Sequence, residues 1–413
     1  MGSSGSKVEM IFDAIEANNV EKVYTILENS NKNNKILNLN IKNKNGYYPL
    51  NYAIVQYRFE IFKLLIDYAN QHDIFLELNE KNKDGYYPLL STLIFNNIEM
   101  VKLLMEYANQ YQIILEVNEK VEHGNYPLSQ VIENKNIEII KLLIEYANQH
   151  QLILELNNKN NMGENPLLHA IYVNNIEKLE LLIEYANQHH IILELNEKDN
   201  YGAYPLLCAI YINDIEVVKL LIEYANHHQM ILELNAEDKY GYYPLLRAIV
   251  ENNTEIVKLL MEYANQHQII LELNEKDKGG DYPLLMAIVE NNIEMVKLLM
   301  EYANQHQIIL ELKEKEKGGD YLLRTAIIKN NIEMVKLLIE YANQHHIILE
   351  LNEKDKSGEY PLLIAIRNNN IKIIKLLIEY AQQHQIILEM EDKEELGSYS
   401  EMIQLIQNYE KEK

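Results

Sequence analysis

A Tyr-Pro-Leu-like element returns nine times in this chain at a fixed step of 39 residues. All 8 prolines keep this step, and a leucine takes the one remaining place: Pro49, Pro88, Pro127, Pro166, Pro205, Pro244, Pro283, Leu322 and Pro361. Glycines keep the same step from Gly46 to Gly397. A period of this length predicts a stack of equivalent repeats, each of which buries its apolar face only against its neighbours. It also argues against catalysis, because an active site is singular.

A length of 413 residues would by itself suggest two or three globular domains. The unbroken period predicts one elongated domain instead, and a hydrophobic fraction of 47% allows a continuous core. No apolar run approaches the roughly 20 residues that a membrane helix needs. The first six residues, Met1–Ser6, look like the remnant of an expression tag and not like part of the repeats.

The formal net charge is -24, from 62 acidic and 38 basic residues. This balance opposes binding to nucleic acid, which needs a basic surface to neutralise phosphates, and docking on a membrane of anionic lipid. It favours a protein or peptide partner with a basic surface. Cys208 is the only cysteine, which excludes an internal disulfide and a cysteine-based zinc cluster. We therefore expect a monomeric protein of a reducing, cytoplasmic compartment.

The repeat at residues 85–123 shows how the residues predict a first helix. Gly85 suits a turn, because positive φ costs glycine little. Pro88 suits a first helical position, because that N–H has no intrahelical partner. The sequence predicts a short helix over 89–95, ended by Asn96-Asn97, since asparagine tolerates the left-handed conformation.

A second helix is predicted from Ile98 onward. Its apolar stripe follows the helical period of 3.6: Ile98, Val101, Met105 and Ala108. An Ile113-Ile114-Leu115 run comes after it. This run could extend the helix or form a short buried connector, and periodicity does not decide between the two.

The order of helix, tight turn, helix and glycine-bearing loop is that of an ankyrin repeat. The ankyrin signature Asp-x-x-Gly-x-Thr-Pro-Leu-His-x-Ala appears here as Asp199-Asn200-Tyr201-Gly202-Ala203-Tyr204-Pro205-Leu206-Leu207-Cys208-Ala209. The phrase of the second helix appears as Glu255-Ile256-Val257-Lys258-Leu259-Leu260. The chain thus resembles the ankyrin repeat family over essentially its whole length. The resemblance implies an all-α, elongated solenoid of about ten helix-turn-helix units with longer connecting segments.

The chain departs from the family in three ways. The step is 39 residues where the family has 33, and the six extra residues fall after the second helix. Alanine replaces the glycine with which the family ends that helix, as at Ala69, Ala108 and Ala147. Tyrosine and leucine mostly replace the threonine and histidine of the signature. We therefore expect a longer second helix or a distinct connector.

The ends of the chain fit a capped stack. We predict an N-terminal capping repeat over 7–41, nine repeats of 39 residues over 42–392, and a partial C-terminal capping repeat over 393–413. The first of these is polar where inner repeats carry Tyr-Ala-Asn-Gln-His. Polar terminal repeats keep a solenoid soluble.

Histidine and tyrosine also recur at the same step. Equivalent positions in such a stack lie roughly 10 Å apart. Two histidines so far apart cannot share a zinc ion, whose bonds to nitrogen are about 2.0–2.1 Å. We interpret the histidines (His72, His150, His189, His228, His267, His306, His345 and His384) as residues of helix ends, with a pH-sensitive surface as the alternative. We interpret the tyrosines from Tyr68 to Tyr380 as packing between repeats.

Specific contacts need differences between repeats, and three places vary strongly: one position in the first helix, the pair that ends it, and the residues that flank the glycine. In ankyrins the corresponding loop tips and first helices look onto the concave face that grips partners. Tyrosine, methionine and arginine are typical interface anchors. We predict a partner-binding concave face from Met162, Glu164, His169, Tyr172, Tyr201, Tyr211, Tyr240, Tyr242, Arg247, Glu251 and Met286. Neutral variation of a surface is the alternative.

The expected function is a non-enzymatic scaffold that holds a protein or peptide partner on this face. The chain has no phosphate-binding loop and no HExxH motif, and nothing near Cys208 marks an activated nucleophile. We expect no cofactor and no metal. A structural spacer in a larger protein is the alternative function, because the repeats around residues 260–360 are nearly identical and identical repeats recognise little.

Overall fold

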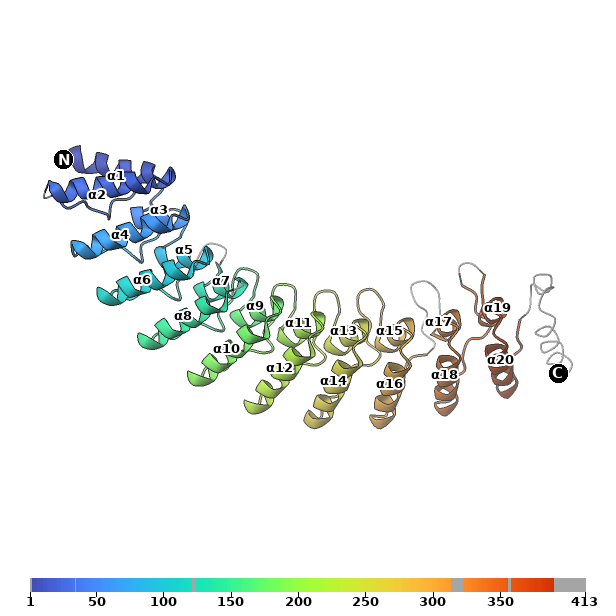
Figure 1. Cartoon of the computed structure of the whole chain (residues 1–413). Coiled ribbons are helices and arrows are strands. Elements are labelled where there is room, and N and C mark those ends of the chain that lie inside the picture. The colour runs from blue at the N-terminus through green and yellow to red at the C-terminus, as the bar shows by residue number, and fades with distance from the viewer. Residues whose placement is uncertain are drawn as a thin grey trace. The chain divides into compact units, whose positions relative to one another are not determined.

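The computed structural model describes residues 2–33, 35–120, 124–134, 136–312, 322–355 and 358–389, with side chains from residue 7 on. Within these ranges the regular structure is α-helical, without a strand. From Pro49 on, short and long helices alternate along the chain, as Figure 1 shows. The prediction of an all-α helix-turn-helix solenoid is confirmed.

The chain divides into two compact units, Met1–Asn200 and Tyr201–Lys413, called here the N-terminal and the C-terminal unit. The N-terminal unit holds α1 (Gly2–Glu16), α2 (Val20–Lys32), α3 (Pro49–Val55), α4 (Phe59–Gln71), α5 (Pro88–Ile94), α6 (Ile98–Gln110), α7 (Pro127–Glu133), α8 (Ile137–Gln149), α9 (Pro166–Tyr172) and α10 (Ile176–Gln188). The C-terminal unit holds α11 (Pro205–Tyr211), α12 (Ile215–His227), α13 (Pro244–Val250), α14 (Thr254–His267), α15 (Pro283–Val289), α16 (Ile293–Gln305), α17 (Leu322–Ile328), α18 (Ile332–Gln344), α19 (Pro361–Arg367) and α20 (Ile371–Gln383).

Each helix pair begins and turns as its residues predict. Pro88 is the first residue of α5, where its missing N–H costs nothing. Asn96, between α5 and α6, has a φ of 52°, in the left-handed region. Asn97 caps α6 by accepting a hydrogen bond from the Met100 N–H at 3.1 Å, which is typically worth about 1 kcal/mol.

Neighbouring pairs bury their apolar faces against one another. From α3 on, within each unit, short helices pack on short helices and long helices on long ones, as α3 packs on α5 and α4 on α6. Leu65, Leu104 and Leu143 of three successive long helices are each 0% exposed. Full burial of such a side chain is worth about 1.5–3 kcal/mol, and only a neighbouring repeat supplies it here.

The loop between pairs turns at a glycine. Gly85 has a φ of 84°, which a residue with a side chain rarely adopts. The side chain of Asn82 holds the turn, because its Oδ1 accepts hydrogen bonds from two backbone N–H groups of the loop, at 2.9 and 2.8 Å. Successive loops lie beside the short helices (Figure 1).

The six extra residues form an extended connector and not a longer helix. Exposure alternates along it: Ile114 and Glu116 are exposed, whereas Leu115 and Val117 are buried. Asn79 of the preceding repeat holds this backbone, because its Nδ2 donates to the Ile114 carbonyl at 2.7 Å and its Oδ1 accepts from the Glu116 N–H at 3.1 Å. The connector alternative is therefore confirmed.

The tyrosine ladder joins each long helix to the connector before it. The Tyr146 hydroxyl accepts from the Leu115 N–H at 3.1 Å and donates to the Ile113 carbonyl at 3.3 Å. Burial raises the pKa of Tyr146, so its hydroxyl keeps its proton. Both bonds recur at Tyr185, Tyr263, Tyr302, Tyr341 and Tyr380. Packing between repeats is confirmed, and the hydroxyl adds a hydrogen-bonding role.

The histidine ladder ends the long helices, as the sequence indicated. His150 follows the last residue of α8, its ring lies 4.3 Å from that of Tyr146, and its Nε2 lies 2.7 Å from Oδ1 of Asn109 in the preceding repeat. The same contact to asparagine, at 2.7–2.9 Å, recurs at His189, His267, His306, His345 and His384. Because an amide oxygen only accepts, Nε2 carries a proton in each case. In the described part of the chain no group of three or more His, Cys, Asp or Glu residues is placed to hold a metal ion.

The predicted repeat boundaries remain predictions. The backbone of residues 2–6, interpreted from the sequence as the remnant of a tag, continues α1. The predicted C-terminal capping repeat at 393–413 lies outside the described residues. At the repeat without proline, α17 still begins at Leu322, and Arg324 occupies a place where most other repeats have leucine. Its guanidinium forms an ion pair with Asp355 at 2.5 Å.

Candidate functional site

The residues predicted to bind a partner divide between the two units. Met162, Glu164, His169 and Tyr172 belong to the N-terminal unit. Tyr201, Tyr211, Tyr240, Tyr242, Arg247, Glu251 and Met286 belong to the C-terminal unit. All of them lie on short helices, on the residue that follows such a helix, or on the loops beside these helices.

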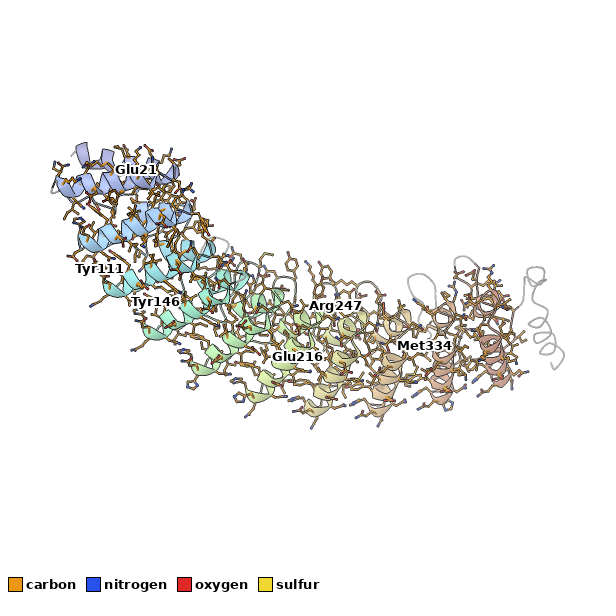
Figure 2. All side chains as sticks on the ribbon, in the orientation of Figure 1. Glu21, Tyr111, Tyr146, Glu216, Arg247 and Met334 are labelled. Carbon is orange, nitrogen blue, oxygen red and sulfur yellow. The ribbon has the colours of Figure 1, made fainter. Side chains whose placement is uncertain are left out.

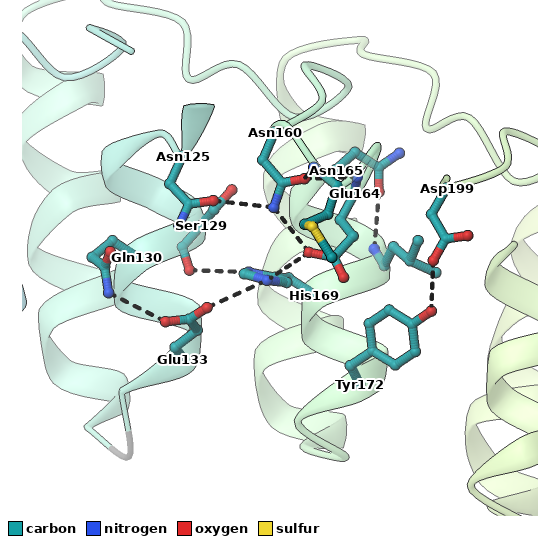
Figure 3. A network of polar contacts seen from close by, with 12 residues as sticks. Asn125, Ser129, Gln130, Glu133, Asn160, Glu164, Asn165, His169, Tyr172 and Asp199 are labelled. Carbon is teal, nitrogen blue, oxygen red and sulfur yellow. Dashed lines mark hydrogen bonds and ion pairs between the residues drawn. The ribbon is translucent and has the colours of Figure 1, made fainter. Parts of the chain in front are cut away.

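In the N-terminal unit, His169 on α9 is the centre of a polar network (Figure 3). The residue is 8% exposed. Its Nδ1 lies 3.4 Å from the Ser129 carbonyl oxygen, and its Nε2 lies 3.2 Å from Glu164 and 3.4 Å from Glu133. All three neighbours are acceptors, so both ring nitrogens are placed to donate, which is the arrangement of an imidazolium ion.

At His169, the neighbouring charges and hydrogen bonds together affect the pKa more strongly than burial does. Burial alone would lower the pKa of His169, but the hydrogen bond to Glu164 and the negative charges of Glu164 and Glu133 raise it above its ordinary value. The hydrogen bond from His169 in turn lowers the pKa of Glu164. Asn160 completes the network by donating to Glu164 at 2.8 Å and to Asn125 at 3.0 Å. The network therefore fixes the side chains between α7 and α9.

The exposed members of this group lie around the network. Met162 is 45% exposed at the loop tip, and its carbonyl accepts from the Asn200 N–H at 2.9 Å. Tyr172, the last residue of α9, is 38% exposed, and its hydroxyl donates to Asp199 at 3.0 Å (Figure 3). Met162 and Tyr172 can thus touch a partner, whereas His169 is buried and holds its neighbours in place.

The C-terminal unit places a lysine between two exposed tyrosine rings. The Lys239 Nζ lies 3.4 Å from the ring centre of Tyr201 and 5.1 Å from that of Tyr240. The two rings are 42% and 56% exposed. The backbones are joined as well, because the Lys239 N–H donates to the Tyr201 carbonyl at 2.9 Å. A cation over an aromatic face is worth about 0.5–1 kcal/mol at an exposed site, so this lysine holds both rings at the loop tips.

Arg247 on α13 does the same for a second pair of rings. Its guanidinium carbon lies 4.1 Å from the ring centre of Tyr211 and 5.3 Å from that of Tyr242, and the group forms an ion pair with Glu251. Tyr211 is 60% exposed, whereas burial, with the charge of Asp277 nearby, raises the pKa of Tyr242. Figure 2 shows Arg247 on the side of the short helices.

We call Tyr201, Tyr211, Tyr240, Tyr242, Lys239 and Arg247 the tyrosine surface. Met286 occupies on α15 the position that Arg247 has on α13, and it is half-buried. Sequence reasoning missed Lys239, although the residue at this loop position differs between repeats (Asn161, Asn200, Lys239). It also missed Glu133 and Asn160, which no local motif marks as partners of His169.

Cys208 on α11 is buried, at 3% exposure, which does not favour a reactive thiol. In the ranges that the structure describes, no helix is both long enough and apolar enough to cross a membrane.

Comparison with known proteins identifies the family. A family model described as ankyrin repeats (3 copies) matches residues 11–114, 109–192, 185–270, 227–309, 265–346 and 304–389. A search of curated proteins finds no match. The matched segments together run from residue 11 to residue 389, and the helix pairs and glycine loops described above agree with them. The chain therefore belongs to the ankyrin repeat family, whose repeats generally mediate protein–protein interaction.

Proposed function

We propose that the chain is a non-enzymatic scaffold that binds a protein or peptide partner through the tyrosine surface of its C-terminal unit. The observation that carries this proposal is that the rings of Tyr201, Tyr211 and Tyr240 are exposed. The cations of Lys239 and Arg247 already hold these rings in place. These side chains stand on short helices and loop tips, which in the ankyrin family look onto the concave face.

The arrangement lowers the cost of binding. A free side chain loses rotamer freedom when a partner immobilises it, at about 0.5–1.5 kcal/mol each. Here each ring already contacts a cation in the free chain, so part of its rotamer freedom is lost before the partner binds. The exposed part of the ring is available for contact. Tyrosine and arginine are also the residues that most often dominate interface energies.

The charge of the chain supports a basic partner. A net charge of -24 attracts a positively charged protein over a distance and speeds the encounter. Once the partner is bound, affinity rests on the few tyrosine anchors. In the N-terminal unit, Met162 and Tyr172 are exposed candidates for a contact of their own, with the His169 network as their support.

The test begins with capture of the partner by the full chain at low and moderate salt, identified by mass spectrometry. The dissociation constant is then measured by calorimetry for the wild type, Tyr211→Ala and Tyr240→Ala. We expect each substitution to weaken binding about 5- to 30-fold, the effect of losing an interface anchor. The urea midpoint should change little, because both rings are more than half exposed.

Tyr24→Ala is the matched control, because Tyr24 on α2 is 53% exposed and the same atoms are removed. It should leave the dissociation constant unchanged. An equal loss of affinity in Tyr24→Ala and Tyr211→Ala would contradict the assignment of the binding surface.

A structural spacer is the second candidate. The observation that favours it is that the contacts between repeats are alike. The tyrosine and histidine hydrogen bonds between repeats recur with nearly equal lengths in both units. A spacer predicts that relatives differ in the number of repeats and vary freely at Tyr211 and Tyr240. A scaffold predicts that these two positions are kept.

A further inference from the structure

A second exposed feature lies on the connectors that follow the long helices. One large apolar side chain per repeat stands there at the same position, between 41% and 69% exposed. In the N-terminal unit these are Ile36, Phe75, Ile114, Ile153 and Ile192, and in the C-terminal unit Ile231, Ile270, Ile309, Ile348 and Ile387. Single exposed apolar residues are ordinary on a protein surface, but a row that repeats in register forms an apolar edge within each unit.

A glutamate accompanies almost every member of this row. It comes two residues later, as Glu77, Glu116, Glu155 and Glu194 in the N-terminal unit. Because the connector is extended, residues two apart point to the same side, and exposure shows this at Ile114 and Glu116. The edge therefore presents an apolar and an acidic side chain in turn.

Two of these glutamates carry no ion pair in the described part of the chain. Three residues further on, Glu119 and Glu197 form ion pairs with Lys81 and Lys159. In the described part of the chain, Glu116 and Glu155 take part in no such pair. The backbone beneath them is held, since Asn79 and Tyr146 bond to the connector of Ile114.

We infer that this edge binds a basic amphipathic helix of a partner protein, with an apolar residue at every seventh position and lysine or arginine beside it. Packed helices, and hence successive repeats, are about 8–10 Å apart. Seven residues of a helix span about 10.5 Å and return to nearly the same face. An extended peptide does not fit as well, because three residues cover about 10 Å but reverse the side chain. The glutamates of the edge favour a partner helix that carries lysine or arginine beside each apolar residue.

Two other occupants fit the charges less well. A second copy of this chain would bring its own acidic edge, at a net charge of -24 per copy. A membrane of anionic lipid would be repelled by the same glutamates. The inference does not depend on the tyrosine surface, and either surface can fail without the other.

The test uses the full chain and a labelled synthetic helix of about 28 residues, with leucine at every seventh position and lysines on both sides of it. Fluorescence anisotropy measures the dissociation constant. The control peptide has the same composition with the leucine step broken. The protein variants are Ile114→Ser/Ile153→Ser and Glu116→Gln/Glu155→Gln, with Val173→Ser/Ile176→Ser as the matched control at 36% and 38% exposure.

We expect the regular peptide to bind to the wild type. The isoleucine variant should bind it about tenfold more weakly, because the two isoleucine side chains that the peptide would bury are absent. The glutamate variant should bind about threefold more weakly at low salt, with a flatter salt dependence. The control variant should bind as the wild type does.

Equal binding of the broken-step peptide would overturn the inference, because net charge alone would then explain it. So would unchanged affinity in Ile114→Ser/Ile153→Ser. Binding to zwitterionic vesicles that this variant loses would assign the edge to lipid instead. A concentration-dependent dimer in sedimentation that the same variant abolishes would assign it to a second copy.

Discussion

Replacing Tyr146 by phenylalanine tests how much one rung of the tyrosine ladder stabilises the stack. The change keeps the ring and removes the hydroxyl that accepts from the Leu115 N–H at 3.1 Å and donates to the Ile113 carbonyl at 3.3 Å. Leu115 is 1% exposed, so its N–H has no ready access to water. A buried donor left without a partner costs about 1–3 kcal/mol. We expect Tyr146→Phe to lower the free energy of unfolding by that amount in a urea titration.

Hydrogen exchange provides the local measurement, because repeat proteins do not always unfold in one step. Since about 1.4 kcal/mol corresponds to a factor of ten, the Leu115 amide should exchange about 5- to 150-fold faster in the variant. Tyr24→Phe is the control at 53% exposure, and it should change the free energy of unfolding by less than about 0.5 kcal/mol. Unchanged exchange at Leu115, or equal effects of both substitutions, would refute the assigned role of the hydroxyl.

Three further predictions concern the network, the loops and the connectors. His169 has a raised pKa when folded, so its stabilising contribution is complete below its unfolded pKa of about 6.5 and is lost as pH rises through the folded pKa. Glu164 has a lowered pKa, so its contribution is complete above about 4.5 and is lost as pH falls through its folded pKa. The cost of His169→Gln, measured by urea midpoints, should therefore be largest between about pH 4.5 and 6.5, where both contributions are complete, and should shrink as pH rises toward the folded value of His169; a cost independent of pH would argue for a neutral histidine. Gly241→Ala should lower the free energy of unfolding by about 1–3 kcal/mol, because φ is 89° and a Cβ would lie 2.9 Å from the backbone of the next loop. It should cost more than Gly358→Ala, where φ is 81° but no described atom lies within 4 Å of the added Cβ. Equal shifts of the melting temperature in the two variants would count against the clash. Asn79→Ala removes both hydrogen bonds that this side chain makes to the next connector and should cost about 1–2 kcal/mol in a urea titration, whereas no loss would mean that water replaces them.

Much of the fold followed from residues whose conformational preference is local. Pro88 can begin a helix and cannot continue one, Asn96 tolerates positive φ, and Gly85 turns the loop, so helix bounds could be predicted almost to the residue. The run at Ile113 was not decided in this way. Its extended form depends on hydrogen bonds from Asn79 and Tyr146, which lie 33 to 35 residues away in the sequence.

The candidate site was predicted as a set of positions, not as contacts. Variation between repeats pointed to His169 and Arg247, but it did not separate a buried residue from an exposed one. His169 is enclosed because Glu133 approaches from the preceding helix pair and Glu164 from the loop just before α9. Lys239 was missed because its function depends on the two tyrosine rings that lie on either side of it in space.

By itself, the amino-acid sequence determined the kind of repeat, its length and the family, because these depend on steric preferences and on a period that can be counted. Only the tertiary structure decided which side chains meet. A residue on one repeat finds its partner on the next, about 39 positions along the chain, and the stacking geometry selects that partner. The pairing of Arg247 with Tyr211, the raised pKa of His169 and the exposed apolar row on the connectors all follow from that geometry.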